Sequence, residues 1–387
     1  STFASSNTGF ANEPPIHSTE TAIYLENKFT PLPFIELRLG ARGVGYGTSG
    51  YSTLAYEPRV GLDVALNRDL TLNISYMDVN QFSHLLFTHG SIMSNEVWVP
   101  SSNSIQPAHS KQVSLGWRGL FLKGMLDAEV SLYQKTLSNL ATYREGYTSL
   151  MGDGNWRSKV ETGGKGEAYG AEFLISKSHG QWTGFASYAW SKATRTYQGI
   201  NRGREYLFEY DRPHTGSISL NRKLSGRVSA SMAWVYQTGL PFTPVVGRQY
   251  TLGVEYDDEQ FYYEALIYGE RNSERMRDYH RLDLALTYST RTKYRGYKAQ
   301  WTFAVYNAYN RRNPYFYYFS DNSREVSGKP LSSDSYQQHL FLYQVSFFPI
   351  IPTLSYKVFF DREERMKGLG RKEKQPCAPW FRRLLYH

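Results

Sequence analysis

The sequence predicts an all-β protein, an antiparallel β-barrel whose strands cross a membrane. Three observations point to it: apolar and polar residues alternate along many segments, short and long connections alternate between these segments, and the polar sides of the segments carry ionisable residues. Together they favour a wide barrel with long loops at one end and short turns at the other.

Strand-period alternation is the main signal, because successive side chains of a β-strand point to opposite faces. It is clean in one C-terminal segment, where Leu282, Leu284, Leu286 and Tyr288 alternate with mostly polar neighbours. The same pattern recurs at residues 35–39, 59–66, 70–76, 126–132, 169–175, 226–237, 298–307 and 353–360. About 14 such segments can be counted, each near the roughly 9–11 residues with which a tilted strand crosses a bilayer.

The connections between these segments differ in length. Short turns are predicted at 67–69, 122–124, 178–180 and 223–225. Long polar stretches are predicted at 82–109, 145–167, 195–213, 239–278 and 310–337. Outer-membrane barrels have short turns on the periplasmic side and long loops on the extracellular side. A soluble β-sandwich has no reason to keep its long loops at one end, so the layout favours the membrane barrel.

The polar side of the predicted strands carries charged residues that a small, packed barrel would have to bury at high cost. They are Glu36, Arg38, Arg59, Asp63, Asp127, Glu129, Glu172 and Asp283. A wide lumen would let these side chains meet water or a plug. This pattern therefore favours a large barrel over a small filled one.

Composition is consistent with this architecture. Aromatic residues make up 16% of the 387 residues, and rings with one polar end suit the two interfaces of a membrane, although soluble β-proteins are also rich in them. Mean hydropathy is −0.52, and no apolar run reaches the roughly 18 residues that a transmembrane helix needs. The single cysteine, Cys377, excludes an intrachain disulfide. The net charge of +9 forms no basic stripe, so we expect no nucleic-acid partner.

An ordered series of short motifs carries a resemblance to a known family. The series comprises Asn80-Gln81-Phe82, Glu96-Val97-Trp98-Val99-Pro100, Gly164-Lys165-Gly166-Glu167-Ala168-Tyr169-Gly170, Tyr210-Asp211-Arg212-Pro213-His214, Thr238-Gly239-Leu240-Pro241-Phe242-Thr243, and Tyr306-Asn307 with Asn310 and Asn313-Pro314. Over about residues 16–360 the chain resembles the TonB-dependent receptors of the Bacteroidetes type. The resemblance implies a Gram-negative outer-membrane barrel of about 22 strands with an N-terminal plug, energised from the inner membrane through TonB.

The resemblance also sets expectations for the two ends of the chain. About 14 of the expected 22 strands are counted and no plug is recognised, so we expect a C-terminal portion of the barrel, because open sheet edges are not tolerated in lipid. Residues 1–360 are expected to form this portion. Residues 361–387 are charged, show no strand alternation and are expected to be a disordered tail. The expected partners are the lipid bilayer, the TonB complex through the plug region, a nutrient and a surface lipoprotein.

Catalytic and cofactor chemistry has little support in the sequence. No His-Glu-x-x-His motif and no Cys/His metal cluster is present, and Gly164-Lys165-Gly166 lacks the spacing of a phosphate-binding loop, so these glycines are interpreted as a loop that enters a strand. Asp257, Asp258 and Glu259 form an acidic loop that is weak as a cation site. We therefore expect no catalytic residues, no metal and no cofactor, and the chain is not predicted to be an enzyme.

Candidate substrate contacts lie in the predicted extracellular loops. Aromatic and basic residues there would suit sugars, peptides and ring-bearing or anionic ligands, and the candidates are Trp156, Arg202, Tyr256, Tyr262, Tyr263 and Tyr268. The alternative is that rings at the bases of the loops belong to the outer aromatic girdle. The predicted function is TonB-dependent uptake of a scarce nutrient such as a siderophore, glycan or peptide. The alternatives are a passive outer-membrane channel, a barrel enzyme and a soluble β-rich binding module.

Overall fold

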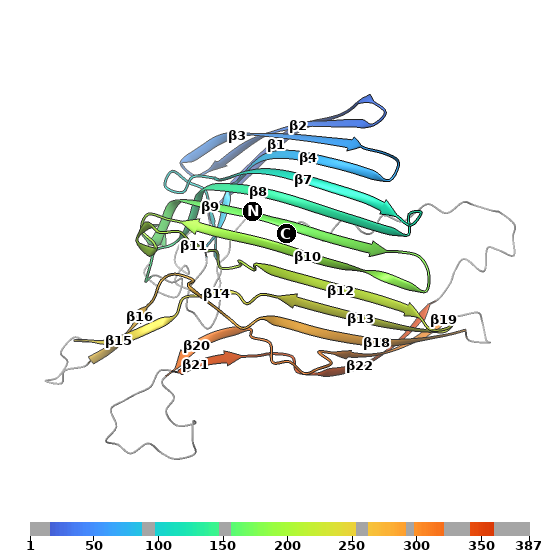
Figure 1. The fold of residues 1–387 in the computed structure, drawn as a ribbon. Coiled ribbons are helices and arrows are strands. Elements are labelled where there is room, and N and C mark those ends of the chain that lie inside the picture. Colours follow the sequence, from blue (N-terminus) through green and yellow to red (C-terminus); the bar gives the residue numbers. More distant parts are fainter. Residues whose placement is uncertain are drawn as a thin grey trace, which may run out of the picture.

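The computed structural model describes residues 16–86, 97–146, 156–252, 262–291, 298–320 and 341–359. Within them one large antiparallel sheet dominates, and its strands follow one another as a meander (Figure 1). The strands along this sheet are β1 (Ser18–Leu32), β2 (Ile35–Thr48), β3 (Tyr51–Ala65), β4 (Leu70–Gln81), β7 (Ala108–Phe121), β8 (Leu126–Tyr143), β9 (Val160–Lys177), β10 (Trp182–Thr196), β12 (His214–Lys223), β13 (Val228–Gln237), β18 (Tyr279–Arg291), β19 (Lys298–Tyr306) and β22 (Ile351–Phe359). A fourteenth member, β11 (Tyr206–Leu207), pairs with β10.

The predicted all-β class and the antiparallel order are confirmed by this sheet. Among the described residues no pairing joins β1 to β22, so the sheet is open rather than closed on itself. No helix in this part of the chain has the length and apolar character needed to cross a membrane. The two short 3-10 turns, η1 (Trp156–Lys159) and η2 (Asn201–Gly203), lie in connections between strands.

One end of the sheet, here called the turn end, carries short connections. The predicted turns at 67–69, 122–124, 178–180 and 223–225 are all found there. Asn67 accepts a bond from the amide of Asp69 at 2.8 Å, and left-handed backbone at Leu122, Lys123 and Gly124 reverses the chain between β7 and β8. The opposite end, the loop end, holds the long connections (Figure 1). One short turn breaks the rule: Thr48 and Tyr51 pair directly across a two-residue turn at the loop end.

The long connections contain structure that alternation did not predict. The described residues form four two-stranded sheets outside the large sheet: β5 (Ser83–Leu86) with β6 (Val97–Pro100), β14 (Pro241–Phe242) with β17 (Glu274–Arg275), β15 (Val245–Leu252) with β16 (Tyr262–Tyr268), and β20 (Phe316–Ser320) with β21 (Phe341–Val345). The interpretation of 145–167 as one loop was wrong in its second half, because β9 begins at Val160. Gly164-Lys165-Gly166 therefore lies inside a strand.

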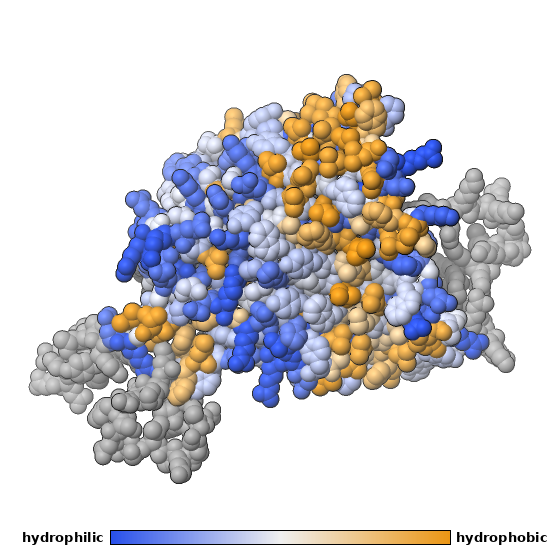
Figure 2. All heavy atoms as spheres, viewed as in Figure 1, coloured by the Kyte–Doolittle hydropathy of each residue, from blue (hydrophilic) through white to orange (hydrophobic). Residues whose placement is uncertain are grey.

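Register separates the residues into two faces. Leu132 of β8 pairs with Leu115 of β7 and Ala171 of β9, whereas its neighbour Tyr133 pairs with Ser114 and Gly170. The face that contains Leu132 is called the apolar face, and its exposed members include Leu39, Val60, Ile74, Leu115, Phe173, Leu284, Leu286, Phe303 and Leu354. Figure 2 shows apolar side chains gathered in a band across the strands, displaced toward the turn end. Exposed aliphatic side chains on this scale call for apolar surroundings.

Aromatic rings border this band. Toward the loop end Tyr169 and Trp190 have ring centroids 5.8 Å apart, and Tyr188 stacks on His214 at 6.2 Å. Toward the turn end Trp301 and Tyr356 lie 4.4 Å apart. Two aromatic belts with aliphatic residues between them are typical of a membrane-spanning barrel wall, because ring-bearing side chains with a polar tip suit the headgroup level.

The opposite, polar face pairs its charges and hydroxyls across strands. Arg38 bonds Asp63 at 2.6 Å, and Arg42 joins Glu57 at 2.9 Å and Glu20 at 2.8 Å. Further pairs on this face are Lys28 with Glu36, Arg118 with Asp127, Arg281 with Asp283, Ser75 with Ser114, Ser187 with Ser217, and Thr287 with Thr302. Many charges and hydroxyls of the polar face are thus paired across neighbouring strands.

Candidate functional site

The loop end of the polar face is shaped by glycines of β9. A Cβ at Gly164 would stand 2.2 Å from the ring of Tyr197, and one at Gly166 would stand 2.6 Å from Nη1 of Arg195. Only glycine therefore lets these two side chains of the β10 end lie against the β9 backbone. This gives Gly164-Lys165-Gly166 a packing role: it makes room for a basic and an aromatic residue on the polar face.

Tyrosines and charged groups cluster above these glycines. The rings of Tyr197 and Tyr206 lie 6.5 Å apart and are buried, and Arg271 places its guanidinium 5.5 Å from the Tyr206 ring. Burial raises the pKa of Tyr206 and also the pKa of Glu209, whose carboxylate lies 3.6 Å from Arg271. The cluster therefore combines low polarity with fixed positive charge, which strengthens electrostatic interactions within it.

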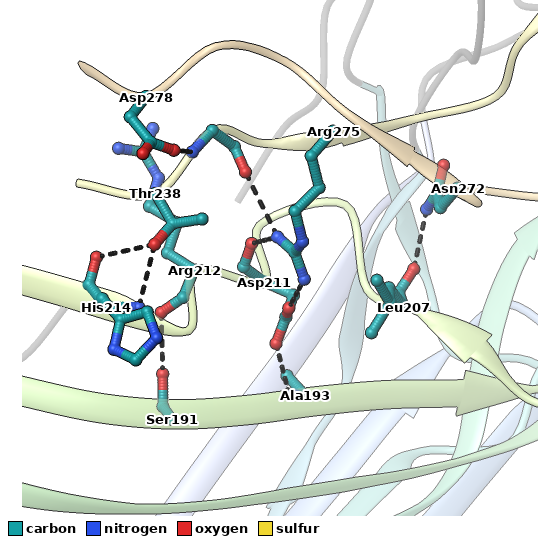
Figure 3. A network of polar contacts seen from close by, with 11 residues as sticks. Ser191, Ala193, Leu207, Asp211, Arg212, His214, Thr238, Asn272, Arg275 and Asp278 are labelled. Carbon is teal, nitrogen blue, oxygen red and sulfur yellow. Dashed lines mark hydrogen bonds and ion pairs between the residues drawn. The ribbon is translucent and has the colours of Figure 1, made fainter.

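A buried ion pair joins two loops beside this cluster (Figure 3). Asp211, in the connection after β11, accepts a bond from the Ala193 amide at 2.6 Å and is bonded by the guanidinium of Arg275 on β17. Arg275 also donates to the carbonyl of Asp211 at 2.9 Å and to that of Gly239 at 3.2 Å. The side chain of Asp211 has no exposed surface. The two loops are thus held together by one charge pair and its surrounding bonds.

A second carboxylate holds the start of the connection after β13. Asp278 accepts bonds from the Tyr236 hydroxyl at 2.7 Å and from the Gly239 amide at 3.0 Å. The bond from Tyr236 is the main reason that the pKa of Asp278 is lowered. Thr238 bonds both backbone groups of His214, at 3.1 and 3.2 Å (Figure 3). The motifs 210–214 and 238–243 therefore meet in space.

The asparagines of the last motif fasten the connection between β19 and β22. Asn307 is buried; its backbone N–H donates to the Asp283 carboxylate at 2.9 Å, and its side-chain amide donates to the carbonyl of Arg311 at 2.9 Å. Asn313 bonds both backbone groups of His280 at 3.0 Å, and Asn310 accepts the Ile350 amide at 3.0 Å. Each asparagine satisfies backbone groups that a loop leaves without strand partners.

The hairpin β5–β6 closes a different part of the loop end. His84 and Ser101 are buried and bond each other at 3.2 Å, and Tyr46 of β2 donates to the Ser101 carbonyl at 3.2 Å. Burial lowers the pKa of His84 to about 4. The imidazole is therefore neutral near pH 7 and serves packing and hydrogen bonding.

A family model described as TonB dependent receptor-like, beta-barrel, matches residues 1–332. The chain belongs to the TonB-dependent receptor family. No curated protein sequence matches it. The predicted family and its outer-membrane location are thereby confirmed, and the family consists of transport receptors.

Solved structures of receptors share the fold at low sequence identity. The ferric-catecholate import receptor Fiu from E. coli K12 aligns with a TM-score of 0.53 and 16% identity over 78% of this chain and 42% of its own. The pyoverdine receptor FpvA from Pseudomonas aeruginosa PAO1 aligns with a TM-score of 0.52 and 16% identity over 78% of this chain and 40% of its own. The FrpB iron transporter from Neisseria meningitidis aligns with a TM-score of 0.51 and 13% identity over 78% of this chain and 42% of its own. The chain thus spans less than half the length of these receptors.

The residues predicted as substrate contacts of the receptor are not gathered into one described site. Arg202 is exposed in η2 with left-handed backbone, φ 57°, and Tyr268 is exposed at the end of β16. Tyr256 lies outside the described residues, as do Asp257, Asp258 and Glu259. Trp156 opens η1 and Tyr262 and Tyr263 lie in β16, but their side chains are outside the described part. The predicted contacts stay predictions.

Some of the residues that converge belong to the motifs of the series, for which the sequence predicted no role in a site. Asp211, Gly239 and Asn307 belong to the recognised series, but Arg275 and Asp278 do not. Little in the sequence indicates a role for Arg275 and Asp278, because a single Arg or Asp in a polar loop belongs to no periodic pattern. In the described ranges no group of three or more His, Cys, Asp or Glu is arranged to hold a metal ion.

Proposed function

We propose that the chain forms the C-terminal part of the barrel wall of a receptor that imports a scarce nutrient across the outer membrane, with energy delivered by TonB. The observation that supports this most is the separation of the sheet into an apolar and a polar face, in a chain of the TonB-dependent receptor family. The apolar face would contact lipid. The polar face would line the lumen and contact the plug.

The loop end would face the outside of the cell and capture the solute. Its loops are fastened by the ion pair Asp211–Arg275 and by Asn307, so they form a fixed rim around the lumen. The predicted contacts Trp156, Arg202, Tyr256, Tyr262, Tyr263 and Tyr268 belong to this proposal. We further propose that the receptor is of the Bacteroidetes type, that it has a surface lipoprotein partner and that it is not an enzyme. Residues 1–360 would form the barrel portion and residues 361–387 a tail.

The siderophore class is one candidate nutrient, since the receptors of similar fold include ferric-catecholate and pyoverdine receptors. A barrel wall has no energy source of its own, so uphill uptake requires the inner-membrane partner. A passive channel would carry solute without it.

The test is uptake in cells that carry the full-length receptor, with and without functional TonB. Growth is measured under iron limitation and on panels of glycans and peptides as sole nutrient. The proposal expects at least one nutrient whose uptake requires both the receptor and TonB. Receptor-dependent uptake that persists at the same rate without TonB would identify a passive channel instead.

A further inference from the structure

Two cations approach strand β9 from opposite sides on the polar face. Lys135 of β8 pairs in register with Ala168 of β9, and Arg195 of β10 pairs with Gly166. Nη1 of Arg195 would lie 2.6 Å from a Cβ at residue 166, so the guanidinium lies over the backbone of β9, where Nη1 donates to the Thr194 carbonyl at 2.8 Å. Because Ala168 and Gly166 are small, no bulky side chain of β9 separates the two cations. The charge of Arg195 acts directly on Lys135.

A third cation continues this arrangement toward the loops. Tyr206 of β11 is the cross-strand partner of Arg195, and Arg271 stacks over the Tyr206 ring at 5.5 Å. Arg271 is 8% exposed, its Nε finds no hydrogen-bond acceptor among the described residues, and its Nη2 lies 3.6 Å from Glu209, beyond hydrogen-bond distance. Buried donors of a guanidinium that lack acceptors are costly, so an acceptor at this place would be bound favourably.

The local charge balance is positive. Glu209 is the carboxylate that faces these cations, 3.6 Å from Arg271, and its burial disfavours the ionised form and raises its pKa. The next carboxylate, Asp211, is fully engaged by Arg275 and the Ala193 amide. No carboxylate among the described residues forms an ion pair with Lys135 or Arg195. Among the described residues, three cations therefore lie near one carboxylate in a site of low polarity.

From this geometry we infer that Lys135, Arg195 and Arg271 hold an anionic group of the imported solute, a carboxylate or phosphate, at the loop end of the polar face. The inference rests on the proposed function and adds the class of solute. Guanidinium and ammonium donors supplied by three elements would match the several oxygens of such a group. Attraction within the rim would also concentrate anions at the mouth of the lumen.

The test is calorimetric binding to the purified full-length receptor in detergent at low salt. Citrate and inorganic pyrophosphate serve as anionic probes, and maltotriose as a neutral probe. Lys135→Gln is expected to weaken binding of the anion about tenfold or more, because each charge-assisted bond contributes roughly that factor. Lys135→Arg, which keeps the charge, is expected to retain most of the affinity. Lys192→Gln is the matched control, since Lys192 lies on the apolar face of β10, in register with Tyr169.

Two results would overturn the inference: neither anion binds the wild-type receptor more tightly than maltotriose, or Lys192→Gln weakens binding as much as Lys135→Gln. Binding in detergent does not involve TonB, so this outcome is separate from the uptake test. If uptake requires TonB but neither anion binds, only the inferred anion site is wrong. If uptake does not require TonB, the proposed function is wrong, whether or not the anions bind.

Discussion

Arg275 and Asp211 form a buried ion pair although 64 positions of the chain separate them. Asp211 belongs to the connection between β11 and β12, and Arg275 to the connection between β13 and β18. Each would be an ordinary solvated charge if its loop were free. Their pairing holds two neighbouring loops together at the loop end of the sheet.

Removal of Arg275 should therefore loosen both loops. Arg275→Ala leaves the fully buried carboxylate of Asp211 without its counter-charge, and such a loss costs about 3–5 kcal/mol. Hydrogen exchange should accelerate in residues 206–213 and 239–245 together. The control is Arg204→Ala, which breaks the exposed pair with Glu270 and should cost less than about 1 kcal/mol. Equal effects of the two variants would show that the buried pair does not fasten the loops.

Glycine 164 should not tolerate a methyl group. In Gly164→Ala the new Cβ meets the Tyr197 ring at 2.2 Å, so the ring must leave its buried place and β9 loses its packing at the rim. Gly47→Ala in β2 is the matched control, because nothing lies within 4 Å of its Cβ. The measurement is the temperature at which the full-length receptor unfolds, seen as a change in its migration in gels after heating. We expect Gly164→Ala to lower this temperature and Gly47→Ala to leave it unchanged. If both shift it alike, the close approach is not what requires glycine.

An arginine placed on the apolar face should lower the stability of the receptor more, the deeper it lies in the membrane. Leu132→Arg places a guanidinium on the apolar face, within the aliphatic band, at an expected cost of about 2–4 kcal/mol near the bilayer midplane. Thr136→Arg lies on the same face of β8, four residues nearer the loop end, and should cost about 1 kcal/mol or less. Urea unfolding of the receptor in lipid vesicles measures the difference, and equal costs would contradict the assignment of this face to lipid.

The hairpin β5–β6 should weaken on acidification because of His84. An opened hairpin takes up a proton near pH 6.5, whereas the closed one does so only near pH 4, so protons favour the open form between these values. Stability is full above pH 6.5 and falls toward pH 4 by about 3 kcal/mol. Hydrogen exchange of residues 83–86 and 97–101 at pH 7 and pH 5 measures this fall.

His84→Gln should remove most of this pH dependence, since the glutamine side chain does not titrate. His179→Gln changes an exposed imidazole in the turn between β9 and β10 and serves as the control. Exchange in the hairpin that is the same at both pH values in the wild type would show that His84 does not govern its stability.

Much of the large sheet could be predicted from sequence because its physical signal is local. Leu282, Leu284, Leu286 and Tyr288 alternate with polar residues since one face of β18 meets apolar surroundings. Turns such as 67–69 were also predictable, because an Asn side chain caps its own backbone there. Both signals come from neighbours along the chain.

The rim could not be predicted in the same way, because its contacts join distant segments. Nothing near Arg275 in the sequence indicates that its partner is Asp211. Gly164-Lys165-Gly166 was interpreted as a loop because glycine usually weakens strands, whereas here it admits Tyr197 and Arg195 onto β9. The pairing of β14 with β17 was missed because these strands have two residues each, too few for alternation to appear.

Cysteine labelling in intact cells can show which end of the sheet faces the outside of the cell. Variants Arg202→Cys, at the loop end, and Lys123→Cys, at the turn end, are made in the full-length receptor after Cys377 and any further cysteine have been replaced by serine. Intact cells are treated with a membrane-impermeant maleimide. We expect rapid labelling of the Arg202→Cys variant, and labelling of the Lys123→Cys variant only after the outer membrane is permeabilised. Equal labelling of the two in intact cells would contradict a receptor wall with loops outside the cell and turns in the periplasm.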